Sequence, residues 1–232
     1  VGGVVGENSG TVKNCSNTGM VSVSGIGMGG SAGGVVGQNA NGIVESCYNT
    51  GTVTGTGTSA GGVVGENSGT VENCYNTGKV NGGDYVGGVV GGNYDTVTDC
   101  YNTGKVTGSG ISLGGVVGKS SYGGTVANCY NTGSVSGSSL IGGVVGQNDS
   151  GTVANCYNTG TVSGKGSVGG VAGENNGTVA NCYYQQSEGA PTKGIGAANG
   201  TVSKVESKTP TQFASGEVAW LLQDGQDSDI WG

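Results

Sequence analysis

A cysteine-containing phrase is repeated seven times along this 232-residue chain, and the repeat constrains the fold more than any other feature. The clearest copy, residues 61–80, reads GGVVGENSGTVENCYNTGKV. Its cysteine recurs every 26 to 32 residues, at Cys15, Cys47, Cys74, Cys100, Cys129, Cys156 and Cys182. A short period built from strand-like apolar runs indicates a solenoid, in which each repeat covers the apolar face of the next.

The composition agrees with such a fold. Glycine supplies 55 residues, a content that without periodicity would indicate disorder. Here the glycines hold fixed places in each repeat, and only 10% of residues are charged, so we interpret them as tight corners. The apolar residues are mostly valine, which suits a thin core of stacked β-branched side chains.

The charge balance excludes some partners. The chain has eight lysines, no arginine, no histidine and a net charge of −7, so we expect no binding of nucleic acid, which needs a basic surface. No run of 18 apolar residues exists, so we expect no membrane insertion. Val1 enters the first repeat directly, which suggests a section of a longer array.

Each repeat predicts three short β segments separated by turns rich in Gly, Asn and Ser. The predicted fold is all-β, a right-handed parallel β-solenoid (β-helix) with one coil of about 27 residues per repeat and a short C-terminal helical cap. Residues 1–186 would form seven coils and residues 187–208 a degenerate eighth coil without cysteine. Residues 209–232 would form the cap that plugs the open end, or a linker.

The residue before the cysteine is predicted to form a corner. Strict strand alternation from Val71 would turn Cys74 outward. A left-handed bend at Asn73 instead lets both side chains point into the core, and stacked Asn side chains can bond to the corners above and below.

The seven cysteines are predicted to form an inward ladder of free thiols. An odd number, with one cysteine per repeat at the same place, argues against disulfides, and in-register strands about 4.8 Å apart orient the side chains poorly for bridging. Metal binding lacks support because the chain has neither histidine nor a Cys-x-x-Cys motif.

A tyrosine follows the cysteine in six copies and would point outward. The resulting stripe either stiffens the sheet by lateral stacking or offers a binding platform for sugar rings or a protein partner. Its members are Tyr48, Tyr75, Tyr101, Tyr130, Tyr157 and Tyr183.

The sequence offers no catalytic constellation, cofactor site or complete metal site. Histidine is absent, and the carboxylates Glu7, Glu66 and Glu174 are scattered singles at one repeat position. The stretch of residues 25–30, GIGMGG, matches a dinucleotide-binding pattern only by letter, because it opens no helix. Asp224, Asp227 and Asp229 lack the spacing and closing Glu of a calcium loop.

The order Gly-Gly-Val-Val-Gly…Gly-Thr-Val-x-Asn-Cys-Tyr-Asn-Thr-Gly-x-Val over residues 1–184 resembles the GLUG motif. This repeat is found in large bacterial surface proteins and in streptococcal IgA1-specific metallopeptidases, whose zinc motif this chain lacks. The segment 213–222 is similar to one that often closes such arrays. The resemblance implies a β-solenoid on an exported, wall-associated bacterial protein.

Three functions follow as hypotheses. The first is a non-catalytic structural and adhesive module at the bacterial cell surface, whose partners are host glycans, host proteins or neighbouring domains. The second is a carbohydrate- or host-protein-binding surface that uses the tyrosine stripe. The third is a β-helix enzyme that cleaves polysaccharides.

Overall fold

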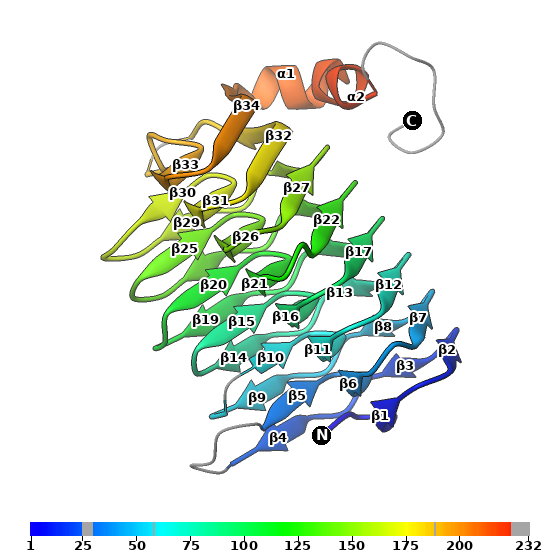
Figure 1. Ribbon diagram of the computed structural model, residues 1–232. Helices are drawn as coiled ribbons and strands as arrows, with labels where there is room; N and C mark the ends of the chain where they lie inside the picture. The colour runs from blue at the N-terminus through cyan, green and yellow to red at the C-terminus, as the bar shows by residue number, and fades with distance from the viewer. Residues whose placement is uncertain (25–29, 58, 188, 224–232) are drawn as a thin grey trace.

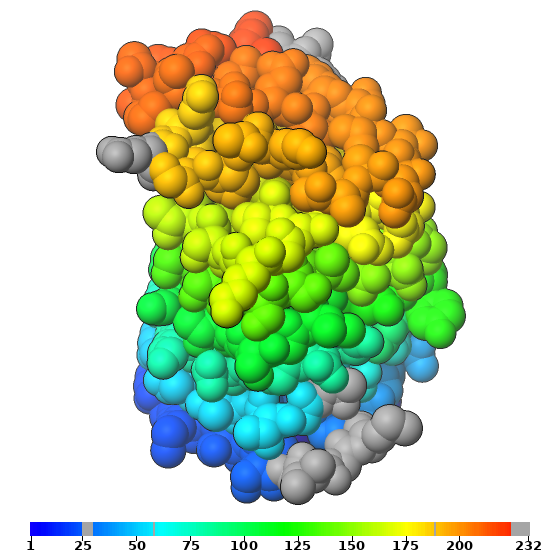
Figure 2. Space-filling model, turned by 90° about the vertical axis from the view of Figure 1, so that its left-hand side faces the viewer, coloured from blue at the N-terminus to red at the C-terminus, as the bar shows by residue number. Residues whose placement is uncertain are grey.

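The protein is a parallel β-solenoid whose coils stack from the N-terminus to two short helices near the C-terminus (Figure 1). The computed structural model describes residues 1–24, 30–57, 59–187 and 189–223. The space-filling view shows the coils as successive bands along the axis (Figure 2). The predicted solenoid and its C-terminal helices are confirmed, and its right hand stays a prediction.

The described residues form four sheets that run along the solenoid axis. Sheet I contains β1 (Val5–Asn8), β6 (Val36–Asn39), β11 (Val64–Asn67), β16 (Val90–Asn93), β21 (Val117–Ser120), β26 (Val145–Asn148), β31 (Ala172–Asn175) and β33 (Ile195–Ala198).

Sheet II is bent and has two limbs. The first limb contains β2 (Thr11–Lys13), β7 (Ile43–Glu45), β12 (Thr70–Glu72), β17 (Thr96–Thr98), β22 (Thr125–Ala127), β27 (Thr152–Ala154), β32 (Thr178–Gln185) and β34 (Thr201–Lys208). The second limb contains β3 (Ser16–Asn17), β8 (Tyr48–Asn49), β13 (Tyr75–Asn76), β18 (Tyr101–Asn102), β23 (Tyr130–Asn131) and β28 (Tyr157–Asn158), and joins the first at β32.

Two further sheets complete each coil. Sheet III contains β4 (Val21–Val23), β9 (Val53–Gly55), β14 (Val80–Gly82), β19 (Val106–Gly108), β24 (Val135–Ser136) and β29 (Val162–Ser163). Sheet IV contains β5 (Ser31–Gly33), β10 (Ser59–Gly61), β15 (Tyr85–Gly87), β20 (Ser112–Gly114), β25 (Leu140–Gly142) and β30 (Val168–Gly169).

A described middle coil therefore has five short strands, so the predicted number of three was wrong. The third coil, for example, contains β10 to β14. The error arose because a two-residue strand such as Tyr75–Asn76 is too short to show any hydrophobic period. The strands pair with equivalent residues of the next coil, as Val64 pairs with Val36 on one side and Val90 on the other.

The Gly-Gly pair marks the corner between sheets IV and I. A Cβ atom on Gly61 would lie 1.9 Å from the carbonyl oxygen of Val64. One on Gly62 would lie 2.0 Å from the carbonyl oxygen of Gly88 in the next coil and 2.4 Å from Cγ of Asn76. Only glycine fits this close approach of backbones, which explains the recurrence of the pair.

The corner predicted before each cysteine is confirmed. The backbone of Asn73 has φ of 53°, and both Val71 and Cys74 are fully buried. The same left-handed bend occurs in every repeat, at Asn14, Ser46, Asn73, Asp99, Asn128, Asn155 and Asn181. Asn tolerates this conformation better than most residues. The bend allows the side chains on both sides of the corner, such as Val71 and Cys74, to point into the same core.

The C-terminal end combines a degenerate coil with the two helices. In β34, Val205 pairs with Cys182 and packs against the end of the core. Helix α1 (Pro210–Ala214) begins with a capping box at Thr209, and α2 (Glu217–Leu222) follows. The helices do not plug the core as expected, because Val218 and Leu222 of α2 pack instead against the side chain of Tyr183.

Candidate functional site

Five tyrosines of the predicted stripe form a stacked ladder on the second limb of sheet II. Neighbouring ring centroids are 4.8 to 5.0 Å apart and the rings are within 4° of parallel. The members are Tyr48, Tyr75, Tyr101, Tyr130 and Tyr157, and all are partly exposed. This tyrosine ladder follows from exact register, since the two-residue strands β8, β13, β18, β23 and β28 place Tyr outward and Asn inward in five successive coils.

The ladder has two different ends. In the first coil Ser16 occupies the position below Tyr48, so no ring extends the stack there. At the other end Phe213 of α1 lies against Tyr157, with ring centroids 5.7 Å apart and the planes tilted by 51°. The sixth predicted member, Tyr183, was wrongly placed on the exposed stripe: it is fully buried, with Val218 and Leu222 packed on it.

Stacking decides what the ladder can offer a ligand. A sugar ring packs on the face of an aromatic ring, and along this ladder the faces are occupied by neighbouring tyrosines. The outer edges of the rings can still contact a partner, because all five tyrosines are partly exposed. Burial raises the pKa of Tyr101 and Tyr130, and it raises the pKa of Tyr157 to about 12, so these phenols are protonated at neutral pH.

An asparagine ladder lies directly behind the tyrosines. The Asn76 amide donates to Oδ1 of Asn102 and to the carbonyl oxygen of Gly78, both at 2.8 Å, and accepts from Asn49 at 2.8 Å. A second ladder runs along the ends of the sheet I strands, where Asn67 donates to Asn93 and accepts from Asn39. The buried amides thereby find hydrogen-bond partners in the neighbouring coils, and they also donate to backbone carbonyl groups in the turns of their own coils.

The sequence prediction missed these two ladders. It placed stacked Asn bonds at the corners, where they occur between Asn128, Asn155 and Asn181. The signal for the others was present, because an Asn also stands at the end of each sheet I strand except β21, which ends at Ser120, and the last strand β33, which ends at Ala198.

The thiol ladder is confirmed as inward and free of disulfides. Cys47 to Cys182 are buried and Cys15 is partly exposed. The backbone N–H of Cys47 donates to the sulfur of Cys74 at 3.4 Å, and the N–H of Cys74 to that of Cys100. Burial raises the pKa of the Cys100 and Cys156 thiols well above the ordinary range, which keeps them neutral and unreactive.

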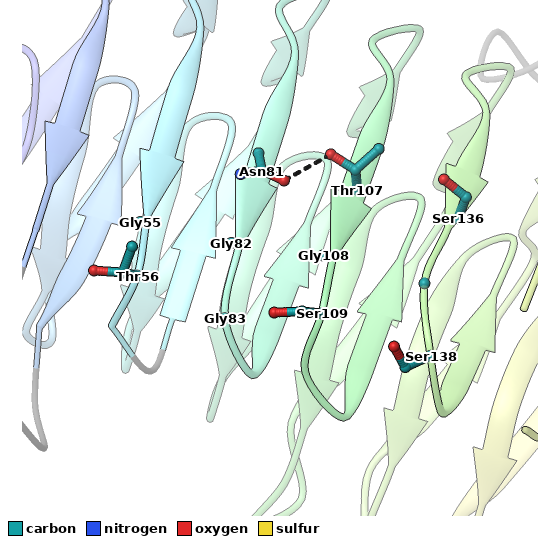
Figure 3. A pocket seen from close by; sticks show the side chains of 11 residues that line it. Gly55, Thr56, Asn81, Gly82, Gly83, Thr107, Gly108, Ser109, Ser136 and Ser138 are labelled. Carbon is teal, nitrogen blue, oxygen red and sulfur yellow. Dashed lines mark hydrogen bonds between the residues drawn. The ribbon is translucent and has the colours of Figure 1, made fainter. Parts of the chain in front are cut away.

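A polar groove of about 670 Å³ runs along the outside of sheet III (Figure 3). Its side chains come from four consecutive coils and carry hydroxyl or amide groups: Thr56, Asn81, Thr107, Ser109, Ser136 and Ser138. The Thr107 hydroxyl and Asn81 Oδ1 are 2.9 Å apart. The groove carries no charged side chain, so it can form hydrogen bonds with a polar ligand but cannot neutralise an ion.

The described residues contain no group of three or more His, Cys, Asp or Glu side chains placed to hold a metal ion. The acidic run at Asp224, Asp227 and Asp229 lies outside the described residues, as do residues 25–29 of the glycine-rich stretch 25–30. In the part of the chain that is described, no helix has the length and apolar character needed to cross a membrane.

In-register ladders of Asn, Cys and Tyr on a parallel solenoid define a repeat module. The model of the GLUG motif matches residues 28–54, 56–81, 82–107, 109–136 and 137–163, which together make up more than half of the chain. The chain therefore belongs to the GLUG-motif family.

The fold also has a solved relative. The chain is similar to a crystal structure described as that of a "putative immunoglobulin A1 protease" from Bacteroides ovatus, with a TM-score of 0.61 and 23% identity over 92% of this chain and 71% of that one. At this identity the likeness concerns the fold alone. A comparison with curated proteins found no match.

Proposed function

We propose that this chain is a non-catalytic structural and adhesive module of a secreted or cell-wall-associated bacterial surface protein. The observation that carries the proposal is the uninterrupted stacking of the coils, in which buried valines and cysteines of successive coils form one continuous core. Such a rod holds its ends apart and presents a long lateral surface. Membership of the GLUG-motif family supports an exported setting, because this repeat is found in large bacterial surface proteins.

Adhesion is the direct test. Beads that carry the purified chain should be retained on host epithelial cells or extracellular matrix under flow, and beads that carry an unrelated rod of similar charge should not. Equal retention of the two would contradict the adhesive role. Incubation with pectin-like and uronic-acid polymers should leave them intact, and release of shorter products would instead support a cleaving enzyme.

The tyrosine ladder supports a second candidate, a surface for host glycans or proteins. Its five partly exposed rings form a straight row, and exposed aromatic residues in a row often mark binding surfaces. The triple variant Tyr75→Ala, Tyr101→Ala and Tyr130→Ala should then lose binding. The matched triple Phe variant keeps the stack and removes the hydroxyls, so retained binding would assign the contact to ring edges.

A further inference from the structure

The outward side chains of sheets IV and I meet in pairs along the angle between the two sheets. In each pair, a sheet IV residue contacts the sheet I residue of the next coil. Ser31 donates to Oε2 of Glu66 at 3.1 Å, and three coils later the Ser112 hydroxyl lies 3.3 Å from Oε1 of Gln147. Between them, Nζ of Lys119 lies 5.4 Å from the ring centroid of Tyr85.

One pair in this series is broken. Ser59 occupies the position of Ser31 and Ser112, but its partner position in the next coil is Gly92, which has no side chain. Ser59 is 2% exposed, and its hydroxyl is the one buried side-chain polar atom without a hydrogen-bond partner in the described residues. Such an orphaned buried group is costly unless something else pairs with it.

Tyr94 and Tyr122, two tyrosines outside the repeated stripe, lie together at this break. A Cβ atom on Gly92 would lie 3.4 Å from both the Ser59 hydroxyl and the Tyr94 hydroxyl, so the tip of Tyr94 stands where a side chain is missing. The Tyr94 hydroxyl donates to Oε1 of Glu66 at 3.1 Å and forms no hydrogen bond with the Ser59 hydroxyl. Tyr122 lies against Tyr94, with ring centroids 5.8 Å apart.

Tyr122 is held in a costly conformation for a side chain that packs so little. It is 85% exposed and has φ of 53°, in a turn with two more residues than the turn of the preceding coil. A bulky residue in the left-handed region is uncommon, and glycine would occupy the site without strain. An exposed aromatic ring maintained there is typical of a binding contact.

The charges at the break favour a neutral ligand. Glu66 and Lys119 both face it, and the Lys119 ammonium is 3.6 Å from the carboxylate of Asp149. With Asp95 exposed nearby, the local balance is acidic, which disfavours a carboxylated or sulfated ligand. Aromatic rings beside a few hydrogen-bonding groups suit a ligand with an apolar ring face and hydroxyls at its rim.

We propose that the break at Gly92 binds one neutral pyranose residue of a glycan, which stacks on Tyr122 beside Tyr94 and presents its hydroxyls to Glu66, Lys119 and the unpaired Ser59. A ligand hydroxyl that takes the place of the Tyr94 phenol over Gly92 forms hydrogen bonds with both Glu66 and Ser59. This site deepens the proposed adhesive function and rests on it, and it lies apart from the tyrosine ladder.

Two variants test the site without weakening the fold. Tyr122→Gly removes the stacking ring and relieves a positive φ, so its melting temperature should equal or exceed that of the parent. Gly92→Gln supplies the side chain that Gln147 provides to Ser112, gives Ser59 a partner and fills the site. The exposed Ile111, on the same coil as Lys119, gives the control Ile111→Ala.

The measurement is binding of labelled protein to an array of neutral and acidic glycans, followed by calorimetric titration with the neutral glycan bound best. The parent and Ile111→Ala should bind equally, and Tyr122→Gly and Gly92→Gln should each weaken binding by about tenfold or more. Full binding by both variants, preference for acidic glycans, or no binding to any glycan would overturn the site. Bead adhesion that persists without glycan binding would leave the adhesive function standing, whereas loss of adhesion with glycan binding intact would remove only that function.

Discussion

The third coil and the degenerate last coil have the same backbone register but different burial. Val71 of the third coil is fully buried, whereas Val202, at the equivalent position in β34, is 42% exposed. The corner also persists, since Lys204 has φ of 53° as Asn73 does. Backbone pairing with one neighbour is thus enough to reproduce the conformation of a coil. Burial of its apolar side chains requires neighbouring coils on both sides, and we expect this burial to stabilise the coil.

The largest expected difference between the two coils comes from a buried charge. Val71→Lys places an unpaired ammonium between coils on both sides and should cost about 4 kcal/mol or more of unfolding free energy. Val202→Lys leaves the ammonium in water and should change it by less than about 1 kcal/mol. Urea unfolding followed by circular dichroism measures both, and equal losses would contradict the comparison.

The sheet I asparagine ladder should show a smaller difference of the same kind. Asn67 pairs with asparagines on both sides, whereas Asn175 accepts from Asn148 and donates only to backbone carbonyls, at 3.1 and 3.2 Å. We expect Asn67→Ala to cost about 2–3 kcal/mol and Asn175→Ala about half as much, because fewer buried groups lose partners. The same urea titration applies, and a larger loss at Asn175 would show that the last coil carries more stability than its exposure indicates.

Thiol labelling compares the first coil with the others. The native protein should react first at the partly exposed Cys15, while the six buried thiols react slowly, and all seven should react quickly in denaturant. Mass spectrometry after timed labelling locates each modified cysteine. Fast native labelling of Cys74 would place it at the surface and overturn the corner at Asn73.

The smallest effect concerns alkaline pH. The pKa of Tyr94 and that of Tyr157 are raised to about 12 by burial, with the charge of Glu66 and the neighbouring Tyr130 contributing respectively. A tyrosine whose pKa is raised on folding contributes stability that is complete below the unfolded value near 10 and is lost as pH rises to about 12. Absorbance of tyrosinate should therefore show a late phase near pH 12, and Tyr94→Phe should reduce it.

The repeat period made much of this structure predictable. The position of the cysteines, the left-handed corner at Asn73 and the free thiols all follow from one residue recurring at one place in a stacked coil. The outward direction of five tyrosines follows from the same corner. These features depend on neighbours that the sequence itself specifies, because each coil packs on a near-copy.

What the sequence left unpredicted depends on contacts outside the repeat. The burial of Tyr183 requires α2 to pack on the outer face of the last coil. The spacing of the apolar residues in α2 predicts a helix, but it does not indicate which surface the helix covers. The orphaned Ser59 becomes visible only when it is paired with Gly92 across two sheets and two coils. The asparagine ladders were missed because an Asn in a turn has a sufficient local explanation before its neighbours are known.

In-register stacking also has a consequence for how such a chain changes over generations. The ladder partners Asn49, Asn76 and Asn102 present the same groups upward and downward, so a duplicated coil meets an acceptable neighbour on both sides. Gain or loss of one whole repeat keeps the register of the ladders and alters the length of the rod by about 4.8 Å, whereas insertion of a few residues in a strand shifts its residues out of register with both neighbouring coils. The fold therefore tolerates recombination between repeats, and such recombination changes the length of the rod.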